Sequence, residues 1–173
     1  SEKTLVETNL NKILSNSFME LSQSIEEKNA LINYSELPTI NGIHFQIQQL
    51  FTNLLSNSLK YSKEDISPII NISYTEIIAK TEAILKEKSS KKYYKIIFSD
   101  NGIGFEQEYA DKIFLLFNRL HGKTEYQGTG VGLAICQKIA ENHKGYIFAE
   151  SQPNEGATFF IYFPVPLSNT TKA

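Results

Sequence analysis

The chain has 173 residues, of which 41% are hydrophobic and 21% charged, and its formal net charge is −2. These values predict one globular domain over residues 1–173, and the elements predicted along the chain place its core at about residues 4–167. They exclude a broad basic surface for nucleic acid or anionic membranes. The single cysteine, Cys136, excludes an internal disulfide, fits a reducing compartment and is predicted to lie in the core. Because the chain opens with Ser1 rather than Met, we expect a piece of a longer protein.

Hydrophobic periodicity predicts a mixture of helices and strands along the chain. The expected strands cover residues 4–7, 31–37, 69–78, 93–99, 146–151 and 157–163. The expected helices cover residues 10–25, 45–61 and 113–117, and a last helix ends at Gly145 as its C-cap. Asn9 or Thr8 is expected to cap the first helix, and Pro38 with an Asn41–Gly42 turn is expected to end the second strand.

Glycines alternate with other residues in GTGVG, residues 128–132, directly before the last predicted helix. Glycine lets backbone N–H groups approach a ligand closely, and a helix N-terminus adds unpaired donors and a partial positive charge. This combination predicts a phosphate site. The pattern is neither a P-loop nor a dinucleotide fingerprint, because no Gly-Lys-Ser/Thr follows it and no strand leads into it. A plain glycine-rich turn is the alternative interpretation.

The helix predicted over residues 45–61 carries a polar stripe next to its apolar face. Its members are spaced by four, three and one residues, and they are Asn53, Asn57, Lys60 and Tyr61. An asparagine carbonyl is a neutral oxygen ligand for Mg²⁺, and a lysine can bind phosphate as a point charge. The stripe therefore suits a triphosphate with its metal, and the alternative is an ordinary solvated helix face.

Asp100 stands at the end of a predicted strand and opens the sequence DNGIGF, residues 100–105. An ionised carboxylate only accepts hydrogen bonds. Adenine offers an N6 amino donor, whereas guanine has an acceptor at the corresponding place. A site built around a donor rejects the analogue that lacks it by roughly 10⁴-fold. Asp100 is therefore a candidate adenine-binding residue, and the alternative is a turn aspartate, since Asp-Asn-Gly favours turns.

Two segments show no regular apolar period. Residues 80–92 are charged and contain serines, so we expect a solvated connector with a mobile tip between the strands of a long hairpin. Residues 118–127 are polar and include Arg119, His121 and Lys123. We expect them to form a mobile lid that is disordered without nucleotide and leads into the glycine loop.

Five motifs follow one another along the chain. They are NLLSNSLKYS at 53–62, DNGIGF at 100–105, IFLLFNRL at 113–120, GTGVGLAI at 128–135 and GATFFIYFP at 156–164. In this order and spacing they resemble the N, G1, F and G2 boxes and the last glycine motif of the catalytic domain of sensor histidine kinases, within the wider gyrase-type ATPase fold. The stretch from FNRLHG to ENHKG, residues 117–145, is most similar to kinases of the phytochrome and PAS-linked type.

The resemblance implies an α+β two-layer sandwich of the Bergerat type, with a mixed, mainly antiparallel sheet of about five strands and three helices on one face. It implies ATP and Mg²⁺ as cofactors, with Asn57 as the metal ligand. Asn53, Lys60 and Arg119 would be the catalytic residues. The nucleotide-binding residues would be Asn53, Asn57, Lys60, Tyr61, Asp100, Gly102, Ile103, Gly104, Phe105, Arg119, Leu120, Gly128, Thr129, Gly130, Val131, Gly132, Leu133 and Thr158. Within this set, Asp100 would bind the adenine amino group and Thr158 would support adenine.

The resemblance also implies donation of the γ-phosphoryl group to a histidine on the protein's own dimerisation and phosphoacceptor domain, with a response regulator downstream. None of His44, His121 and His143 lies in the sequence context of that acceptor. Water-activating relatives carry a glutamate where this chain has Asn53, and an amide cannot act as a general base. Two alternatives stay open, namely a serine/threonine kinase of the same fold and a non-catalytic ATP-binding module. We expect a cytoplasmic domain, free or attached to a membrane-bound sensor, that contacts neither nucleic acid nor membrane.

Two departures from the family pattern are visible. Ser58 replaces a customary alanine, and we expect this small change to be harmless. The hairpin over residues 69–99 is longer than usual, and its length has no functional interpretation from the sequence.

Overall fold

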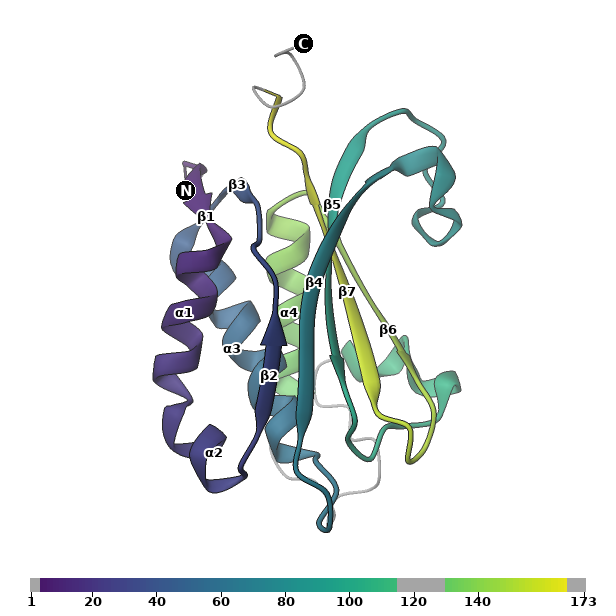
Figure 1. Cartoon of the computed structure of the whole chain (residues 1–173). Coiled ribbons are helices and arrows are strands. Elements are labelled where there is room, and N and C mark those ends of the chain that lie inside the picture. The colour runs from purple at the N-terminus through teal and green to yellow at the C-terminus, as the bar shows by residue number, and fades with distance from the viewer. Residues whose placement is uncertain (1–3, 115–129, 168–173) are drawn as a thin grey trace.

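The computed structural model of the chain describes residues 4–114 and 130–167. Its main sheet has five strands in the order β2 (Leu31–Tyr34), β4 (Ile69–Ile78), β5 (Lys92–Asp100), β7 (Ala157–Pro164) and β6 (Tyr146–Ser151). Strand β2 runs parallel to β4, and the other three neighbouring pairs are antiparallel. The mixed, mainly antiparallel sheet expected from the resemblance is confirmed (Figure 1).

Three longer helices cover one face of this sheet (Figure 1), and they are α1 (Leu10–Glu20), α3 (His44–Lys60) and α4 (Gly130–Asn142). Each reaches a different part of the sheet. The Phe18 ring of α1 lies 5.2 Å from that of Tyr34 on β2, and the Phe51 ring of α3 lies 5.1 Å from that of Phe98 on β5. Helix α4 contacts β6 and β7. The expected two-layer sandwich is therefore confirmed.

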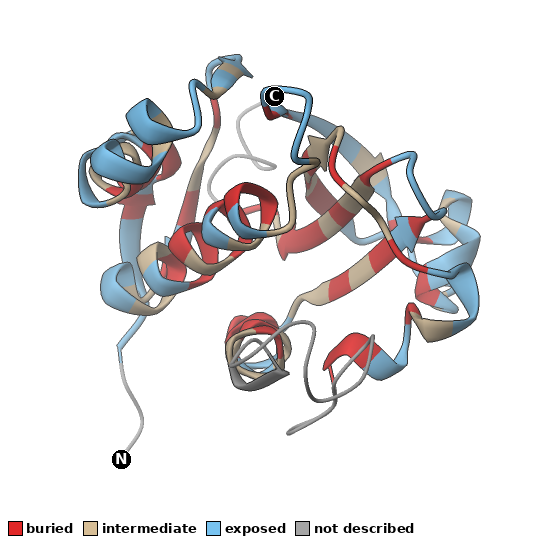
Figure 2. Cartoon of the chain, turned by 90° about the horizontal axis from the view of Figure 1, so that it is seen from below, coloured by how far each residue is buried: buried red, intermediate tan, exposed pale blue. Residues whose placement is uncertain are grey.

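The core lies between the helices and the sheet, and Figure 2 shows the buried residues on the surfaces that face each other. Helix α3 supplies its largest part through an apolar stripe that matches the 3.6-residue period. The buried apolar residues of α3 are Ile47, Leu50, Phe51, Leu54, Leu55 and Leu59. Cys136 of α4 is fully buried in the same core, as the sequence predicted. Among the described residues, no helix is both long enough and apolar enough to cross a bilayer.

In the first third of the chain, the strand expected over residues 4–7 lies at Val6–Asn9 and the one expected over 31–37 ends at Tyr34. Two further differences concern a helix and a turn. The helix expected over residues 10–25 is divided, because Leu21 leaves helical geometry with φ −101° and ψ 12° and a separate helix, α2 (Ser22–Glu27), follows. The expected Asn41–Gly42 turn is wrong. These residues belong to β3 (Thr39–Gly42), which pairs antiparallel with β1 (Val6–Asn9) in a separate two-stranded sheet. The predicted Asn9 N-cap is confirmed, since its side chain accepts a hydrogen bond from the Asn11 N–H.

The end of α4 corrects the predicted glycine C-cap. The residue with left-handed backbone is Lys144, at φ 57°, and Gly145 follows it. The Gly145 N–H donates to the Ala140 carbonyl at 2.8 Å and the Lys144 N–H donates to the Glu141 carbonyl at 2.9 Å, which is a Schellman motif. Glycine is required at 145 for another reason, because a Cβ there would collide with the Tyr162 carbonyl.

The connector between β4 and β5, residues 79–91, has most of its residues exposed, as expected of a solvated connector, but it is folded against the sheet at a few positions. Two short 3-10 turns, Ala79–Thr81 and Ala83–Leu85, begin it. Ala79 and Leu85 are buried against Tyr93 and Tyr162, in a small cluster of their own separate from the main core. Figure 1 shows this connector as a compact excursion at one end of the sheet.

The region after β5 contains two 3-10 turns, Gln107–Tyr109 and Lys112–Phe114. The helix expected over residues 113–117 therefore begins as a 3-10 turn, and its remainder lies outside the described residues, as does the expected lid over residues 118–127.

Candidate nucleotide site

The polar stripe of α3 ends beside the first turn of α4. Asn53 and Asn57 are half-buried on α3, and Lys60 is exposed at its last residue. The Asn53 side-chain N–H donates to the Gly132 carbonyl at 3.3 Å. A Cβ at Gly132 would come no closer than 3.8 Å to the Asn53 side chain, so packing against Asn53 does not require this glycine. The two helices are therefore joined by a polar contact.

Cys136, one turn further along α4, is an apolar component of the site rather than a reactive one. Burial raises the pKa of its thiol to about 12, which outweighs a hydrogen bond from Asn53 that acts in the opposite direction. The protonated thiol therefore persists at neutral pH, and it is inert as a nucleophile.

Asp100 lies where β5, α3 and β7 meet, and three donors converge on its carboxylate. The backbone N–H groups of Gly102 and Ala157 donate to Oδ1 at 2.9 and 3.1 Å. The Ser58 hydroxyl donates to Oδ2 at 2.7 Å. This arrangement exceeds an ordinary Asx turn, because only the Gly102 contact is local in sequence. The carboxylate is thereby held at the end of the sheet with one oxygen turned toward α3.

The glycine segment after Asp100 is docked on the C-terminal end of α3. The Ile103 N–H donates to the Tyr61 carbonyl at 3.0 Å. A Cβ at Gly102 would stand 2.5 Å from the same carbonyl, so this close approach requires glycine. The motifs at residues 53–62 and 100–105, which were expected to surround the nucleotide, are therefore in direct contact. Tyr61 belongs to the first motif and Asp100 to the second.

Two predicted binding residues lie in the core instead of lining open space. Phe105 and Leu133 are 5% exposed each and belong to the main hydrophobic cluster. The Phe105 N–H is held by the Ser151 hydroxyl at 2.8 Å. They support the site from beneath.

Thr158 is not brought together with Asp100. It stands opposite Ser99 in the β5–β7 register, and its hydroxyl donates to the Ser99 hydroxyl at 3.3 Å. Side chains alternate along a strand, and the next residue, Phe159, packs in the core on the helix-covered face. Thr158 therefore points to the other face. The group of β7 that reaches Asp100 is the backbone N–H of Ala157.

Of the glycine loop, residues 128–132, the structure describes residues 130–132. Gly130 begins α4 and Val131 and Gly132 continue it, so a helix N-terminus stands here as expected. Arg119, Leu120, Gly128 and Thr129 lie outside the described residues.

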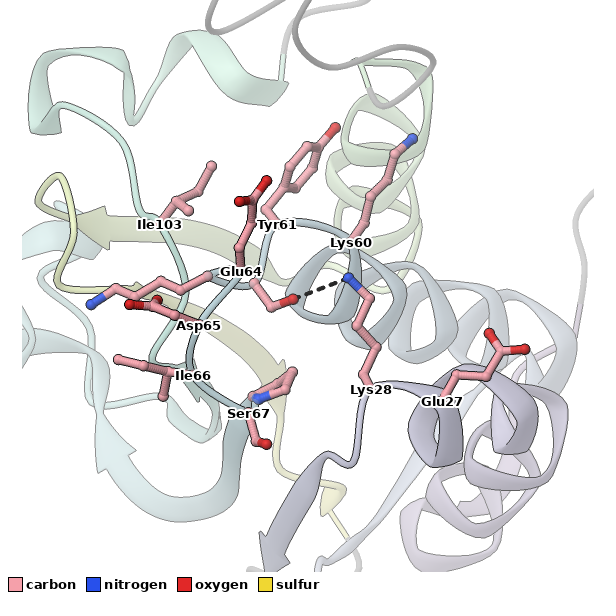
Figure 3. A pocket seen from close by; sticks show the side chains of 12 residues that line it. Glu27, Lys28, Lys60, Tyr61, Glu64, Asp65, Ile66, Ser67 and Ile103 are labelled. Carbon is pink, nitrogen blue, oxygen red and sulfur yellow. Dashed lines mark hydrogen bonds between the residues drawn. The ribbon is translucent and has the colours of Figure 1, made fainter.

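A cavity of about 680 Å³ adjoins the site at the C-terminal end of α3. Its lining includes Lys60, Tyr61 and Ile103, and the Lys28 ammonium donates to the Ser62 hydroxyl across it at 3.1 Å. Figure 3 shows the Lys60 and Tyr61 side chains extending together, away from this Lys28 contact. The Lys60 Nζ lies 5.8 Å from the centre of the Tyr61 ring. A cation and a phenol therefore stand side by side next to Asn57.

Sequence reasoning missed two groups of this site. Ser58 was expected to be a harmless replacement, and Ala157 was not singled out, yet both donate to Asp100. A serine at a buried helix position in an otherwise apolar stripe was the available signal for Ser58, because a buried hydroxyl needs a partner. No side-chain signal exists for Ala157, because it contributes its backbone.

The comparisons with known proteins bear on the same residues. The sequence model described as histidine kinase-, DNA gyrase B- and HSP90-like ATPase matches residues 42–167. The chain belongs to this family. It is 42% identical over 162 residues to cyanobacterial phytochrome A of Nostoc sp. and 36% identical over 162 residues to phytochrome-like protein Cph1 of Synechocystis sp.. Each match covers 94% of this chain, which spans 19% and 20% of the two relatives.

The fold of this family member is also that of solved histidine kinase structures. The nucleotide-free catalytic domain of histidine kinase ThkA superposes with a TM-score of 0.72, at 24% identity, and covers 94% of this chain and 96% of that one. ThkA in complex with the response regulator TrrA gives a TM-score of 0.69 at 20% identity, over 95% of this chain and 42% of that one. The resemblance to histidine kinases, including the phytochrome type, is therefore confirmed.

Proposed function

We propose that this domain binds Mg-ATP and donates the γ-phosphoryl group to a histidine on the protein's own dimerisation domain, in two-component signalling. The observation that carries the proposal is the Asp100 carboxylate at the end of β5, held by one donor from α3, one from β7 and one from the turn that follows β5. Turn chemistry alone needs only one of these contacts. Three hydrogen bonds fix the orientation of this carboxylate, which suits the recognition of a hydrogen-bond donor on a ligand. The adenine amino group is that donor.

The remaining residues take roles according to their place around Asp100. Tyr61, Gly102 and Ile103 form the wall next to adenine, supported from the core by Phe105 and Leu133. Lys60 stands at the end of α3 and would neutralise phosphate charge. The expected nucleotide-binding residues also include Gly104 and the first turn of α4 with Gly132. Four more lie outside the described part of the chain, and they are Arg119, Leu120, Gly128 and Thr129.

The donor set also fits a magnesium ion bound together with ATP. Asn57 offers a half-buried carboxamide on the side of α3 that carries Asn53 and Lys60. Amide and phosphate oxygens are the ligands that Mg²⁺ prefers, and it keeps several waters. Within the described chain, no group of three or more His, Cys, Asp or Glu could hold a metal by itself. Asn57 would therefore hold Mg²⁺ together with the phosphates, and the ion supplies neutralisation of their negative charge.

The identity of the acceptor is argued from Asn53. Its carboxamide N–H is directed to the Gly132 carbonyl, and a carboxamide has no basicity with which to activate water. Phosphoryl transfer requires mainly positioning and charge neutralisation, so a positioned acceptor can complete the reaction without a base at this place. The histidine kinases among the relatives favour a histidine as that acceptor, and the ThkA complex favours a response regulator as the next partner. We propose that the domain acts on the cytoplasmic side.

The test uses radiolabelled ATP, this domain and the histidine-bearing helical hairpin of the same protein as two purified pieces. Transfer to the hairpin in trans, with an acid-labile and base-stable product, is the expected result. Acid-stable phosphoserine would favour the serine/threonine kinase instead. ATP binding without transfer to any acceptor, with the full-length protein equally inactive, would favour a non-catalytic module.

A binding experiment isolates the nucleotide from the acceptor. Asp100→Ala should weaken ATP binding by about 1.5–3 kcal/mol, the range for a hydrogen bond to a charged group. Calorimetric titration measures this change, with Glu36→Ala, an exposed carboxylate between β2 and β3, as the control. GTP that binds the unmodified protein as tightly as ATP would contradict adenine recognition by Asp100.

A further inference from the structure

Ser58 is placed to act on nucleotide recognition through Asp100. It lies on α3 with 7% of its surface exposed, among apolar residues of the core-facing stripe. A helical serine commonly bonds to the carbonyl one turn before it. Ser58 instead donates its hydrogen to Asp100 Oδ2, which is 42 residues away in sequence, at 2.7 Å. A serine hydroxyl has a single hydrogen, so this contact commits its donor completely.

The hydrogen bonds leave the two oxygens of Asp100 in different states. A carboxylate has about four lone-pair sites, two on each oxygen. Both sites of Oδ1 are engaged by backbone N–H groups of Gly102 and Ala157. Within the described chain, Oδ2 has the Ser58 hydroxyl as its donor, so one site of Oδ2 stays available to a ligand. The backbone donors hold Oδ1 in place. The Ser58 hydroxyl then determines the position of Oδ2, and with it the rotation of the carboxylate group.

We propose that Ser58 is a positioning residue that makes the pocket selective for a 6-amino purine. The inference rests on the proposed function and deepens it. With Ser58 in place, the 6-amino group meets the remaining acceptor of Oδ2 in a fixed direction. A 6-oxo purine meets acceptors on both Oδ2 and the Ser58 Oγ. Turning the Ser58 hydrogen toward that oxo group would remove the donor from Oδ2 and leave two acceptors facing each other.

The experiment compares ATP with purine riboside triphosphate, which carries hydrogen in place of the 6-amino group. Calorimetric titration gives the dissociation constants for the unmodified domain, for Ser58→Ala and for the control Ser56→Ala, an exposed serine of the same helix. Ser58→Ala should weaken ATP about three- to tenfold, as expected for one hydrogen bond, and the 6-hydrogen analogue less than about twofold. The selectivity ratio should fall accordingly, and Ser56→Ala should leave it unchanged.

A second pair of variants separates the hydroxyl from the volume of the side chain and covers the case in which Ser58→Ala does not fold. Ser58→Thr keeps the hydroxyl, and Ser58→Val replaces it with a methyl group in nearly the same shape. The Thr variant should retain a higher ratio of ATP to analogue affinity than the Val variant. An equal loss for both ligands, or an equal ratio in the Thr and Val variants, would overturn the role of Ser58. Absence of ATP binding in the unmodified domain would instead overturn the proposed function.

Discussion

Single residues of this domain acquire their chemistry from groups that are distant in sequence. Asp100 accepts from Ser58, Gly102 and Ala157, and Asn53 donates to the Gly132 carbonyl 79 residues away. His143 likewise joins two helices, because its Nε2 accepts the Ile43 N–H at 2.9 Å at the start of α3. Each contact satisfies a polar group that folding removes from water, and leaving such a group unpaired costs about 1–3 kcal/mol.

The metal ligand proposed on α3 can be tested by its dependence on magnesium. Asn57→Ala should weaken Mg-ATP binding roughly tenfold, the lower end of the effect of removing groups around a metal site. ATP with EDTA should bind the variant and the unmodified domain almost equally, because the carboxamide then has no cation to hold. Paired titrations with Mg²⁺ and with EDTA measure this, and Gln49→Ala, exposed on the same helix, is the control. Equal losses in both conditions would remove Asn57 as the ligand.

His143 should make the stability of the domain sensitive to acid. Burial lowers the pKa of its imidazole below the ordinary value of 6.5, although a hydrogen bond to the Ile139 carbonyl acts in the opposite direction. The unfolded chain therefore binds a proton at higher pH than the folded domain, so the stability is complete above pH 6.5 and is lost as pH falls through the folded pKa. The neutral ring, with Nδ1 donating to Ile139 and Nε2 accepting from Ile43, explains the sign.

Urea unfolding between pH 7.5 and about pH 5 measures this dependence. His143→Gln should flatten the curve below pH 6.5, whereas His44→Gln, at an exposed position, should leave it unchanged. An unmodified domain equally stable over this range would contradict the assignment to His143.

At the scale of elements, the long β4–β5 hairpin is stabilised by carboxylates of its own connector. The Glu87 carboxylate accepts from the Tyr93 and Tyr146 hydroxyls at 2.9 and 2.8 Å. Glu82 accepts from the Tyr162 hydroxyl and pairs with Lys95 at 2.7 Å. Burial raises the pKa of Tyr93, and the hydrogen bond to Glu87 raises it further, so the phenol stays protonated and donates. The connector is therefore held on the sheet by three tyrosines from three strands.

Replacement of Glu87 should destabilise the domain although the residue lies in a charged connector. Glu87→Ala leaves the hydroxyl of Tyr93, a residue only 2% exposed, without its acceptor, so we expect a loss of about 1–3 kcal/mol. Glu76→Ala is the control, because its pair with Lys92 is half-exposed at 4.0 Å and such pairs contribute about 0–1 kcal/mol. Urea unfolding of both variants measures the difference. Similar stability of the two would show that the connector is held by its apolar contacts alone.

At the scale of the whole molecule, the described part of the fold gathers the proposed nucleotide-binding groups without a histidine beside them. The described histidines are His44, exposed at the start of α3, and His143, buried with both ring nitrogens engaged. Neither is available next to Asp100 and Asn57. In the proposed function the acceptor histidine belongs to another domain, and positioning of reacting groups accounts for roughly 7–11 kcal/mol of a barrier.

The isolated domain should therefore bind ATP and leave it intact. Incubation with γ-labelled ATP should label the domain no more than the Asp100→Ala variant, and phosphate release should stay at the level of that variant. Chromatography of the nucleotide and autoradiography of the protein measure the two quantities. Strong self-labelling or rapid hydrolysis by the domain alone would contradict the need for an external histidine.

The sequence by itself determined the elements whose signals are local. Strands β4 and β6 begin and end where predicted, because their alternating patterns are bounded by turn residues, and the amphipathic α3 follows from its period. The polar stripe on α3 and the aspartate after β5 were likewise readable, since helix spacing and strand ends are properties of short segments. The motif order then indicated the family.

The tertiary structure decided the features that depend on distant partners. The apolar contacts that bury the connector come from β5 and β7, so a charged segment could only be interpreted as solvated from its own composition. Glycine is required at 145 because the Tyr162 carbonyl on a neighbouring strand leaves no room for a Cβ. The residue with left-handed backbone at this helix end is Lys144. The distant donors on Asp100 come from α3 and β7, and the donor from β7 is a backbone group with no side-chain signature. A residue's type restricts the bonds it can make, and packing selects which of them form.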